Sequence, residues 1–511
     1  MKKNQLKLGT ILSYGQMALG AIVGLAYTPV MLNLLGQSEY GLYNTVSSTI
    51  AMLSVLKLGF NAGYIRNYSK YKKEGNNEAI SKLNGLFLLI FTIIGIVGFA
   101  CGLFLSFNLD FVFDKGLTMQ EYETARVLMI MLTISLAISF PTTVFTSIIS
   151  AHEKFVFLKL LDMIRTVFGP LVTLPLLLAG YGSVGMVAAT VSLSLIVDVI
   201  YFLYVVFVLK NRFVFHDFEK GLFKSLFAYT FFIALNIIVD QINSNVDKAI
   251  IARYRGTVGV SIYSIGYTIY NYYKMFSTSI SGVFTPRVHK IIVEADDNVS
   301  GLRKRLTELF VKIGRIQFLV LGLVLTGLIF FGYEFIVCFW AGPGYEDSFV
   351  VLLLLAIPVT IPMIQNIGIE MQRAQNKHRF RSVAYTIMAV INLVSSIFLC
   401  KAFGPIGSAI GTAVAFVLAN GIIMNVYYHK RCNIDILTFW KNILRVSIGL
   451  IIPVAIGIGI RYWLDLTNIW FFILGVVLYT IVYCISMWFL GMNKYEKSLV
   501  LRPIKKILRK K

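Results

Sequence analysis

Residues 224–287 read KSLFAYTFFIALNIIVDQINSNVDKAIIARYRGTVGVSIYSIGYTIYNYYKMFSTSISGVFTPR and contain two long apolar segments. The segments are residues 225–252 and 258–284, and the short turn 253–257 joins them. About 20 apolar residues are enough for a helix to cross the hydrocarbon core of a bilayer. The stretch therefore predicts a hairpin of two membrane-spanning helices.

Charged side chains interrupt this apolar hairpin at four positions: Asp240, Asp247, Lys248 and Lys274. Amide side chains accompany them at Asn236, Asn243, Asn245 and Asn271. A charge at the centre of a membrane helix costs about 2.5–3.5 kcal/mol on a translocon-based scale, so such residues normally face a bundle interior or an aqueous cavity. We therefore expect this hairpin to be the part of the chain that contacts cargo.

The composition of the whole chain agrees with a membrane location. Of its 511 residues 57% are apolar and only 14% are charged, and the mean hydropathy is +0.75. Apolar runs of nearly 20 residues recur along the full length, which is typical of a polytopic helical membrane protein and not of a soluble domain. The five cysteines are scattered without CxxC or metal-ligand spacing, so we interpret them as packing residues.

Hydropathy predicts fourteen membrane spans. The first apolar run, residues 8–32, is too long for the hydrophobic region of a signal peptide and lacks a small-residue cleavage site, so we expect an uncleaved helix. The predicted spans are residues 8–33, 41–64, 83–107, 125–150, 157–179, 184–209, 225–252, 258–284, 312–338, 348–372, 382–400, 405–428, 443–463 and 468–490.

Lysine and arginine concentrate in every second loop, for example in residues 66–73, 210–224 and 303–305. Because cytoplasmic loops of membrane proteins carry an excess of these residues, we predict that both termini are cytoplasmic. The net charge of +22 then reflects topology and attraction to an anionic leaflet, and no nucleic-acid partner is predicted. The longest loops, near residues 108–124 and 285–311, are too short for a soluble catalytic domain.

An internal repeat relates the two halves of the chain. Gly36 and Tyr43 recur as Gly256 and Tyr263, both 220 residues later. Further pairs at offsets of 221 to 223 are Arg66 with Arg287, Pro141 with Pro362, Ala151 with Ala374, Gly182 with Gly404, and Thr190 with Thr412. Together they predict a duplication of six helices, and the even number gives both copies the same orientation in the membrane.

The duplication defines the predicted domains. Residues 1–215 form an N-lobe of helices 1–6 and residues 216–432 a C-lobe of helices 7–12. Residues 433–492 add helices 13 and 14, and residues 493–511 form a basic cytoplasmic tail. The predicted fold class is an all-α polytopic membrane protein with two pseudo-symmetric six-helix lobes and two extra C-terminal helices.

Several sequence motifs carry a resemblance to a known family: LLGQSEYGLY at 34–43, AHEKF at 151–155, Asp247-Lys248, FWAGPGY at 339–345 and GPIGSAIGT at 404–412. With these motifs the chain resembles the MOP exporter superfamily, specifically the polysaccharide transporter branch of Wzx-type flippases. The resemblance covers nearly the whole chain. The family more often has Asp-Arg where this chain has Asp247-Lys248, which keeps the charge but removes the bidentate guanidinium.

The resemblance implies a MATE-like fold, in which two lobes flank a central cavity lined mostly by helices 1, 2, 7 and 8. It also implies a flippase that moves undecaprenyl-diphosphate-linked oligosaccharides from the inner to the outer leaflet of the bacterial cytoplasmic membrane. The transported repeat units serve the synthesis of O-antigen of lipopolysaccharide, capsule or related glycans. Polysaccharide-assembly proteins are the partners that such a role implies.

A lipid-linked diphosphate needs cations as it leaves water, and a low-dielectric cavity strengthens their attraction. Lys57 and Lys274 suit this role, because the repeat maps Lys57 to position 278 and Lys274 lies one helical turn before it on the same face. We predict that the two lysines bind the diphosphate from opposite lobes. The alternative is that either side chain snorkels to the cytoplasmic interface.

Further cations lie near the outer end of the hairpin. Lys248, Arg253 and Arg255 would form an outward positive path, or alternatively anchor the helices at the interface. Asp240 and Asp247 are candidates for coupling to a proton or sodium ion, and Asp240 is the first choice because a desolvated carboxylate is protonatable near neutral pH. A structural pairing of Asp240 with a lysine stays open.

Sugar contacts are expected where aromatic rings and amides gather. Tyr270 and Asn271 in segment 258–284, with Asn243, are the candidates, although tyrosine is also ordinary packing and interface material. Asp198, Glu370 and Arg373 are secondary candidates, and Asp198 has a purely structural alternative.

Enzymatic functions find little support in the residues. The five histidines lie in or beside cytoplasmic loops without metal spacing, and the chain has no GxxxxGK[ST] P-loop, so we predict no cofactor and no metal. A MATE-like multidrug or cation antiporter is an alternative that the basic cavity disfavours. An integral-membrane glycosyltransferase or polymerase would normally need a large outer loop. A lipid II-type or sporulation-related exporter also stays open.

Overall fold

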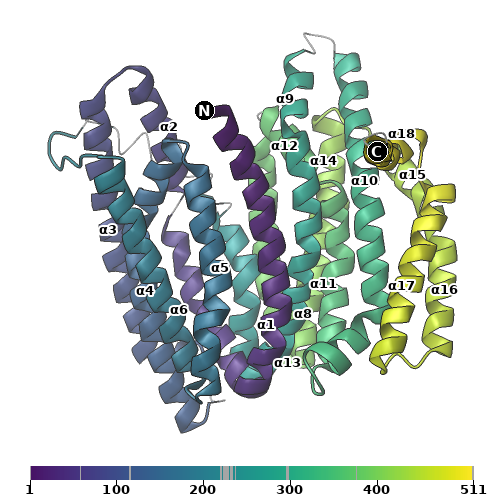
Figure 1. The fold of residues 1–511 in the computed structure, drawn as a ribbon, viewed down its shortest axis with the longest axis horizontal. Helices are drawn as coiled ribbons and strands as arrows, with labels where there is room; N and C mark the ends of the chain where they lie inside the picture. Colours follow the sequence, from purple (N-terminus) through teal and green to yellow (C-terminus); the bar gives the residue numbers. More distant parts are fainter. Residues whose placement is uncertain are drawn as a thin grey trace. The chain divides into compact units, whose positions relative to one another are not determined.

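The computed structural model describes residues 2–57, 59–113, 117–218, 221, 230, 234–235, 237–294, 299–375 and 377–508 (Figure 1). These residues are helical with short connections, and they contain no β-strand. A helix is favoured in an apolar environment because it satisfies its backbone hydrogen bonds internally. The predicted all-α class is confirmed.

Nine helical stretches of the described chain are long and apolar enough to cross a membrane. Two of them, Ile11–Lys57 and Arg379–Arg431, contain a kink and correspond to two predicted spans each. Helix α5 (Phe155–Leu178) coincides with predicted span 157–179, and α8 (Asp247–Ser281) covers most of predicted span 258–284. The start of predicted span 225–252, including Asn236, lies outside the described residues. The protein is a multi-pass membrane protein, as predicted.

Two compact units make up the chain. The first comprises Met1–Ser264 with Leu393–Ser408, and the second comprises Ile265–Asn392 with Ala409–Lys511. The chain therefore passes from one unit to the other inside helical segments. The domain boundaries predicted at residues 215, 432 and 492 remain predictions.

The first unit contains the N-terminal helices. Its elements are α1 (Lys2–Met52), η1 (Leu53–Lys57), α2 (Phe60–Lys73), α3 (Asn77–Phe107), η2 (Leu109–Phe111), α4 (Met119–Ala151), α5, α6 (Gly182–Leu203), η3 (Tyr204–Val208), η4 (Ile242–Val246), the first part of α8 and Leu393–Ser408 of α13.

Aromatic and aliphatic side chains of α2, α3, α4 and α6 form the core of the first unit. The fully buried Tyr64 donates its hydroxyl to Asn84 Oδ1 at 2.7 Å, and Asn84 Nδ2 donates to the Arg212 carbonyl at 3.1 Å. Gly85 permits this approach of the chain after η3, because a Cβ there would lie 2.0 Å from the Val214 carbonyl oxygen. Polar contacts thus fix the packing of a mostly apolar core.

The backbone repeats one uncommon conformation at duplicated positions. Gly36 in α1 has φ 74° and ψ 172°, and Gly256 in α8 has φ 69° and ψ −170°. This region of backbone space is essentially restricted to glycine. Gly182 and Gly404, which the sequence repeat also pairs, have φ values of 56° and 63°. The kinks support the predicted pseudo-symmetry of the two lobes.

The second unit contains the remaining helices. Its elements are the end of α8, η5 (Gly282–Phe284), α9 (Thr285–Val293), α10 (Val299–Glu334), η6 (Phe335–Trp340), α11 (Glu346–Ile364), α12 (Ile367–Ala374), most of α13 (His378–Phe416), η7 (Val417–Ile423), α14 (Met424–Arg431), α15 (Ile436–Ser447), η8 (Ile448–Leu450), α16 (Ile451–Trp463), α17 (Ile469–Ser486), η9 (Met487–Gly491) and α18 (Lys494–Leu508).

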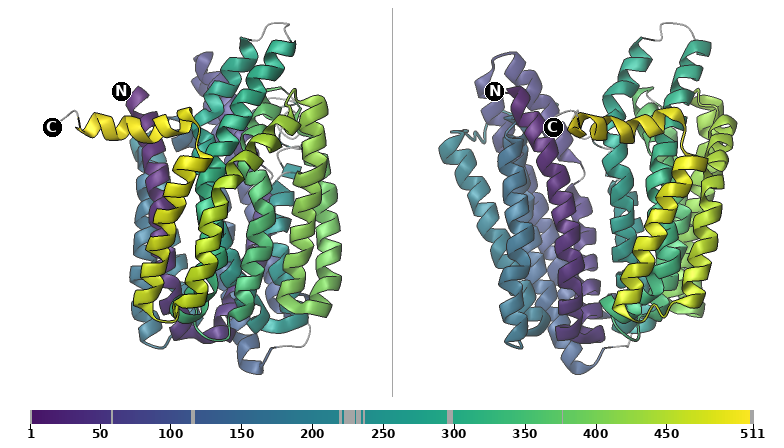
Figure 2. Two further views of the ribbon diagram at one scale, coloured as in Figure 1. Left: turned by 90° about the vertical axis from the view of Figure 1, so that its right-hand side faces the viewer. Right: turned by 45° about the vertical axis from the view of Figure 1, so that its right-hand side comes forward.

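One core of the second unit lies between α10, α16 and α17. Tyr479 packs against Phe330 and Phe331 with ring centroids 5.7 and 5.6 Å away. The buried Tyr483 donates its hydroxyl to the Leu319 carbonyl at 2.9 Å. Helix α18 follows α17 and runs across the direction of α16 and α17 (Figure 2).

Candidate substrate-binding site

The kink at Gly256 folds α8 back on itself, so that Asp247 meets Tyr263. Asp247 is buried, and the Tyr263 hydroxyl donates to its Oδ2 at 2.8 Å. A hydrogen bond to a carboxylate offsets part of the cost of removing that charge from water. Lys248 is half-buried on the same helix. The structure thus places one predicted coupling residue in a hydrogen-bonded, buried position, and its coupling role stays a prediction.

The two predicted arginines of the turn bind backbone carbonyl groups. Arg255 donates from Nε and Nη2 to the carbonyls of residues 400–402 at 2.8 to 3.3 Å. Arg253 donates from Nη1 to the Phe111 carbonyl at 3.2 Å. Carbonyls at helix ends carry partial negative charge and attract cations. Both arginines therefore link α8 to other segments of the first unit, and their contact with substrate remains a prediction.

The same turn packs on the kink of α1. Ser38 Oγ and Thr257 Oγ1 lie 2.7 Å apart, and Ser38 also donates to Glu121. A Cβ on Gly41 would lie 1.8 Å from the Thr257 carbonyl oxygen, so only glycine permits this approach. We call Ser38, Gly41, Glu121 and Thr257 the turn junction. It joins segments from both halves of the sequence repeat.

The turn junction is a feature that the sequence analysis does not predict. The sequence indicates only one part of the turn junction, because Thr118 and Glu121 have the spacing of a capping box. The structure contains that box at the start of α4, with the Thr118 N–H donating to Glu121 Oε2 at 2.9 Å. The contact between Glu121 and Ser38 spans 83 residues and has no local signal.

Lys57 lies at the end of η1, in the first unit. Its ammonium is 5.7 Å from the ring centroid of Phe140 and interacts electrostatically with Asp198. Asp198 also interacts electrostatically with Arg165. Lys57, which the sequence predicts to bind diphosphate, therefore interacts with Asp198, a secondary candidate with a structural alternative.

Lys274 lies in the second unit, on α8. Its ammonium is 5.0 Å from the ring centroid of Tyr270, one turn earlier. Aromatic faces attract cations in this geometry. Tyr270 is only 2% exposed and packs against Tyr267 with centroids 5.4 Å apart, while Asn271 is half-buried. Tyr270 therefore presents little surface to a sugar in this conformation. The prediction that Lys57 and Lys274 bind the same diphosphate stays a prediction.

Asp240 and Asn243 precede α8 in the chain. Asn243 is half-buried in the π-helical turn η4, a type of distortion that is frequent at functional sites. Asp240 is exposed, whereas the sequence predicts a desolvated carboxylate. The secondary candidates Glu370 and Arg373 form an ion pair at 2.8 Å.

No group of three or more His, Cys, Asp and Glu side chains gathers as a metal site within the described part of the chain. The five cysteines carry free thiols.

Solved structures share this fold. A lipid II flippase MurJ in an inward closed conformation matches with a TM-score of 0.69 and 18% sequence identity, covering 97% of this chain and 99% of that one. An inward-facing multidrug resistance MATE family transporter of the MOP superfamily matches with a TM-score of 0.61 and 17% identity, covering 82% of this chain and 99% of that one. A MOP superfamily transporter from Pyrococcus furiosus, with a binding pocket of reverse polarity, matches with a TM-score of 0.57 and 13% identity, covering 84% of this chain and 96% of that one. The fold is therefore that of a multi-pass helical membrane protein, and these flippase and transporter structures share it.

A polysaccharide biosynthesis protein family matches residues 6–292, which is more than half of the chain. The protein belongs to this family. No curated protein matches the chain. The resemblance to the polysaccharide branch of the MOP superfamily is thereby confirmed.

Proposed function

We propose that this protein is a flippase for undecaprenyl-diphosphate-linked oligosaccharide repeat units. It moves them across the bacterial cytoplasmic membrane by alternating access, for the synthesis of O-antigen, capsule or a related polysaccharide, with both of its termini in the cytoplasm. The observation that carries the proposal is membership of the polysaccharide biosynthesis family, together with a fold that matches a lipid II flippase over 97% of the chain.

The charged side chains support an anionic head group as cargo. Lys57, Lys248 and Lys274 bring three positive charges into predicted spans. A lysine is a flexible point charge that can hold a phosphate and release it, and its attraction to phosphate grows where water is excluded. Asp240 and Asp247 are the proposed groups for coupling to a proton or sodium gradient. The proposed transport cycle makes and breaks no covalent bond, so we propose a transporter and not an enzyme.

Complementation of a flippase-deleted bacterium tests the proposal. The wild-type chain is compared with Lys57→Ala, Lys274→Ala and the double variant at equal membrane levels, and surface glycan and lipid-linked repeat units on the cytoplasmic side are measured. Hydrogen bonds to charged groups contribute about 1.5–3 kcal/mol, so we expect each loss to slow export about tenfold or more. Arginine at both positions should restore export, because it keeps the charge.

Lys73→Ala is the matched control, since Lys73 is an exposed lysine at the end of α2. It should export normally. Normal export by the double variant would remove Lys57 and Lys274 from the proposed site and leave Lys248, Arg253 and Arg255 to be tested in the same way.

Two further measurements, one in these strains and one on the purified protein, separate the alternatives. If the protein were a MATE-like antiporter, the cells would export cationic dyes and their surface glycan would not change. If the protein were a glycosyltransferase or polymerase, the purified protein would consume a lipid-linked donor and lengthen a glycan. A flippase would leave the donor and the glycan unchanged.

A further inference from the structure

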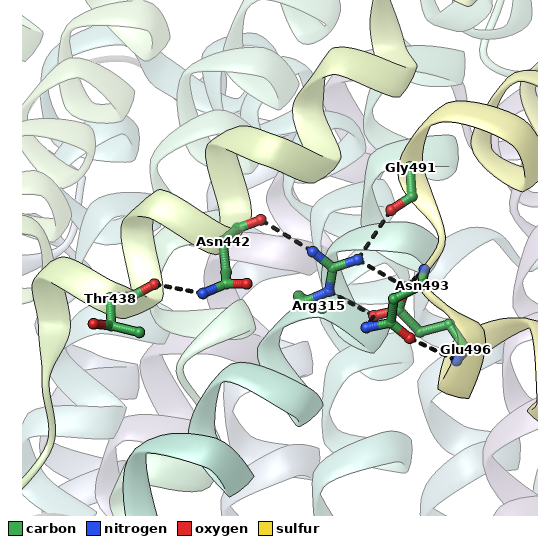
Figure 3. Close-up of polar contacts among 6 residues, drawn as sticks. All are labelled: Arg315, Thr438, Asn442, Gly491, Asn493 and Glu496. Atoms are coloured by element: carbon green, nitrogen blue, oxygen red, sulfur yellow. Dashed lines mark hydrogen bonds and ion pairs between the residues drawn. The ribbon is translucent and has the colours of Figure 1, made fainter. Parts of the chain in front are cut away.

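A buried ion pair holds α18, the last helix of the described chain. Arg315 of α10 donates from Nε to Glu496 Oε1 at 2.6 Å and from Nη2 to Glu496 Oε2 at 2.9 Å (Figure 3). The two side chains are 5% and 3% exposed. A bidentate guanidinium–carboxylate pair fixes orientation as well as charge. The start of α18 is therefore held in a defined direction.

The remaining polar groups of this pair also have partners. Arg315 donates to the Gly491 carbonyl at 2.9 Å and to the Asn442 carbonyl at 3.3 Å. The Asn493 N–H donates to Glu496 Oε2 at 2.8 Å, and the Glu496 N–H donates back to Asn493 Oδ1 at 2.9 Å (Figure 3). These contacts tie α18 to α10, to α15 and to the end of η9.

A second cation of α10 supports the same arrangement. The Lys312 ammonium lies 3.6 Å from the ring centroid of Tyr495, within the range of a cation–π contact. Helix α18 thus leaves the end of η9 sideways and crosses the direction of α16 and α17 (Figure 2). Next to helices that span a membrane, a helix in this direction lies along the membrane surface.

The charge of α18 suits an anionic surface. Its sequence KYEKSLVLRPIKKIL contains five basic residues, Lys494, Lys497, Arg502, Lys505 and Lys506, and one acid, Glu496. Arg315 neutralises that acid. Leu499, Val500 and Leu501 are exposed apolar residues. Basic helices with exposed apolar residues lie in the interfacial region, where anionic lipids attract them.

We propose that α18 is an interfacial helix that binds anionic phospholipid head groups, and that the Arg315–Glu496 ion pair orients it for this binding. The ion pair removes the only negative charge of α18 and fixes the direction of its axis. Every charged residue of α18 outside the pair is positive. This binding is independent of the transported molecule.

Thermal unfolding of the full-length protein in detergent tests the proposal. Phosphatidylglycerol or phosphatidylcholine with the same acyl chains is titrated into the sample, and the midpoint temperature is measured. We expect phosphatidylglycerol to stabilise the wild type more, and high salt to weaken this difference. In the variant K494Q/K497Q/K505Q/K506Q, the phosphatidylglycerol concentration for half-maximal stabilisation should rise about fivefold per removed cation, with an unchanged response to phosphatidylcholine.

The variant K70Q/K72Q/K73Q is the matched control, because these lysines form the basic end of α2. Its phosphatidylglycerol concentration for half-maximal stabilisation should rise much less per removed cation than that of the α18 variant. Equal losses in both variants, or a wild type that does not distinguish the two lipids, would overturn the proposed site.

The orienting role of the ion pair has its own test. Replacing both partners, Arg315→Met with Glu496→Met, keeps all five cations of α18 and leaves no unpaired buried charge. We expect this variant to need several-fold more phosphatidylglycerol for half-maximal stabilisation. A wild-type response in the double variant would show that the pair does not orient α18.

Discussion

The buried pair of Arg315 and Glu496 joins residues that are 181 positions apart. Removing one partner leaves an uncompensated buried charge, which typically costs about 3–5 kcal/mol. We expect Glu496→Gln to lower the free energy of unfolding by about that amount. The double replacement by methionine should cost much less, since apolar residues often substitute for a buried pair without loss. A double-mutant cycle in detergent measures the coupling, and additive losses would contradict it.

His152, in the motif AHEKF, ends α4 beside Tyr68. Its Nδ1 lies 2.9 Å from the Ile148 carbonyl oxygen and its Nε2 3.2 Å from the Tyr68 hydroxyl. Burial lowers the pKa of His152, the bond to Ile148 opposes this, and the charges of Lys72 and Lys154 lower the pKa further.

A histidine with a lowered folded-state pKa makes stability depend on pH. The unfolded chain binds a proton near pH 6.5, whereas folded His152 stays neutral to lower pH. Stability is therefore full above about pH 6.5 and falls as the pH drops from there towards the folded-state pKa. Thermal unfolding from pH 8 to pH 5.5 should show this loss in the wild type, and a smaller loss in His152→Asn. Identical profiles would assign the pH dependence to other groups.

Among the elements, the kinked helices α1 and α8 depend on single glycines. Gly36 and Gly256 adopt a backbone conformation that other residues reach only at a cost of about 1–3 kcal/mol. We expect Gly256→Ala to destabilise the protein by that amount, although nothing lies within 4 Å of the added Cβ. Gly169→Ala is the control, since Gly169 is inside α5 and also has open space. Equal midpoint temperatures of thermal unfolding for Gly256→Ala and Gly169→Ala would show that the conformation at Gly256 does not require glycine.

The positions of many helices along the chain are predictable, because they depend on local sequence. Apolar runs predict where spans occur, because each crossing must satisfy its own backbone hydrogen bonds. The capping boxes Thr118-x-x-Glu121 and Asn493-x-x-Glu496 also mark helix starts in the sequence. The partner of Glu496 is not predictable in this way, because Arg315 is distant in sequence and reaches it only through the packing of α10.

For the whole molecule, the orientation in the membrane is the first prediction to check. In a variant without its native cysteines, we expect a membrane-impermeant maleimide to label Asp465→Cys in intact cells. Glu74→Cys should react only after the membrane is permeabilised, because basic loops stay in the cytoplasm. Both positions are exposed in loops between helices. The opposite labelling pattern would reverse the proposed topology.

The sequence offers candidate site residues but not their arrangement. Charges in apolar segments select Lys57, Asp247 and Lys274 as candidates, since such residues are costly without a function or a partner, and their substrate roles stay predictions. Their partners depend on packing: Asp247 binds Tyr263 across the Gly256 kink, and Lys57 interacts with Asp198 of α6. Hydropathy carries no information on these partners.

The division of the chain into units has a consequence for its synthesis. Leu393–Ser408 belongs to the first unit, although Ile265–Asn392 of the second unit precedes it. A ribosome adds about 5–20 residues per second, so the interval between Ser264 and Ser408 lasts roughly 7–30 s. During that time Arg255 has no access to the carbonyls of residues 400–402, which do not yet exist. The first unit is therefore completed only after Ile265–Asn392 of the second unit has been made.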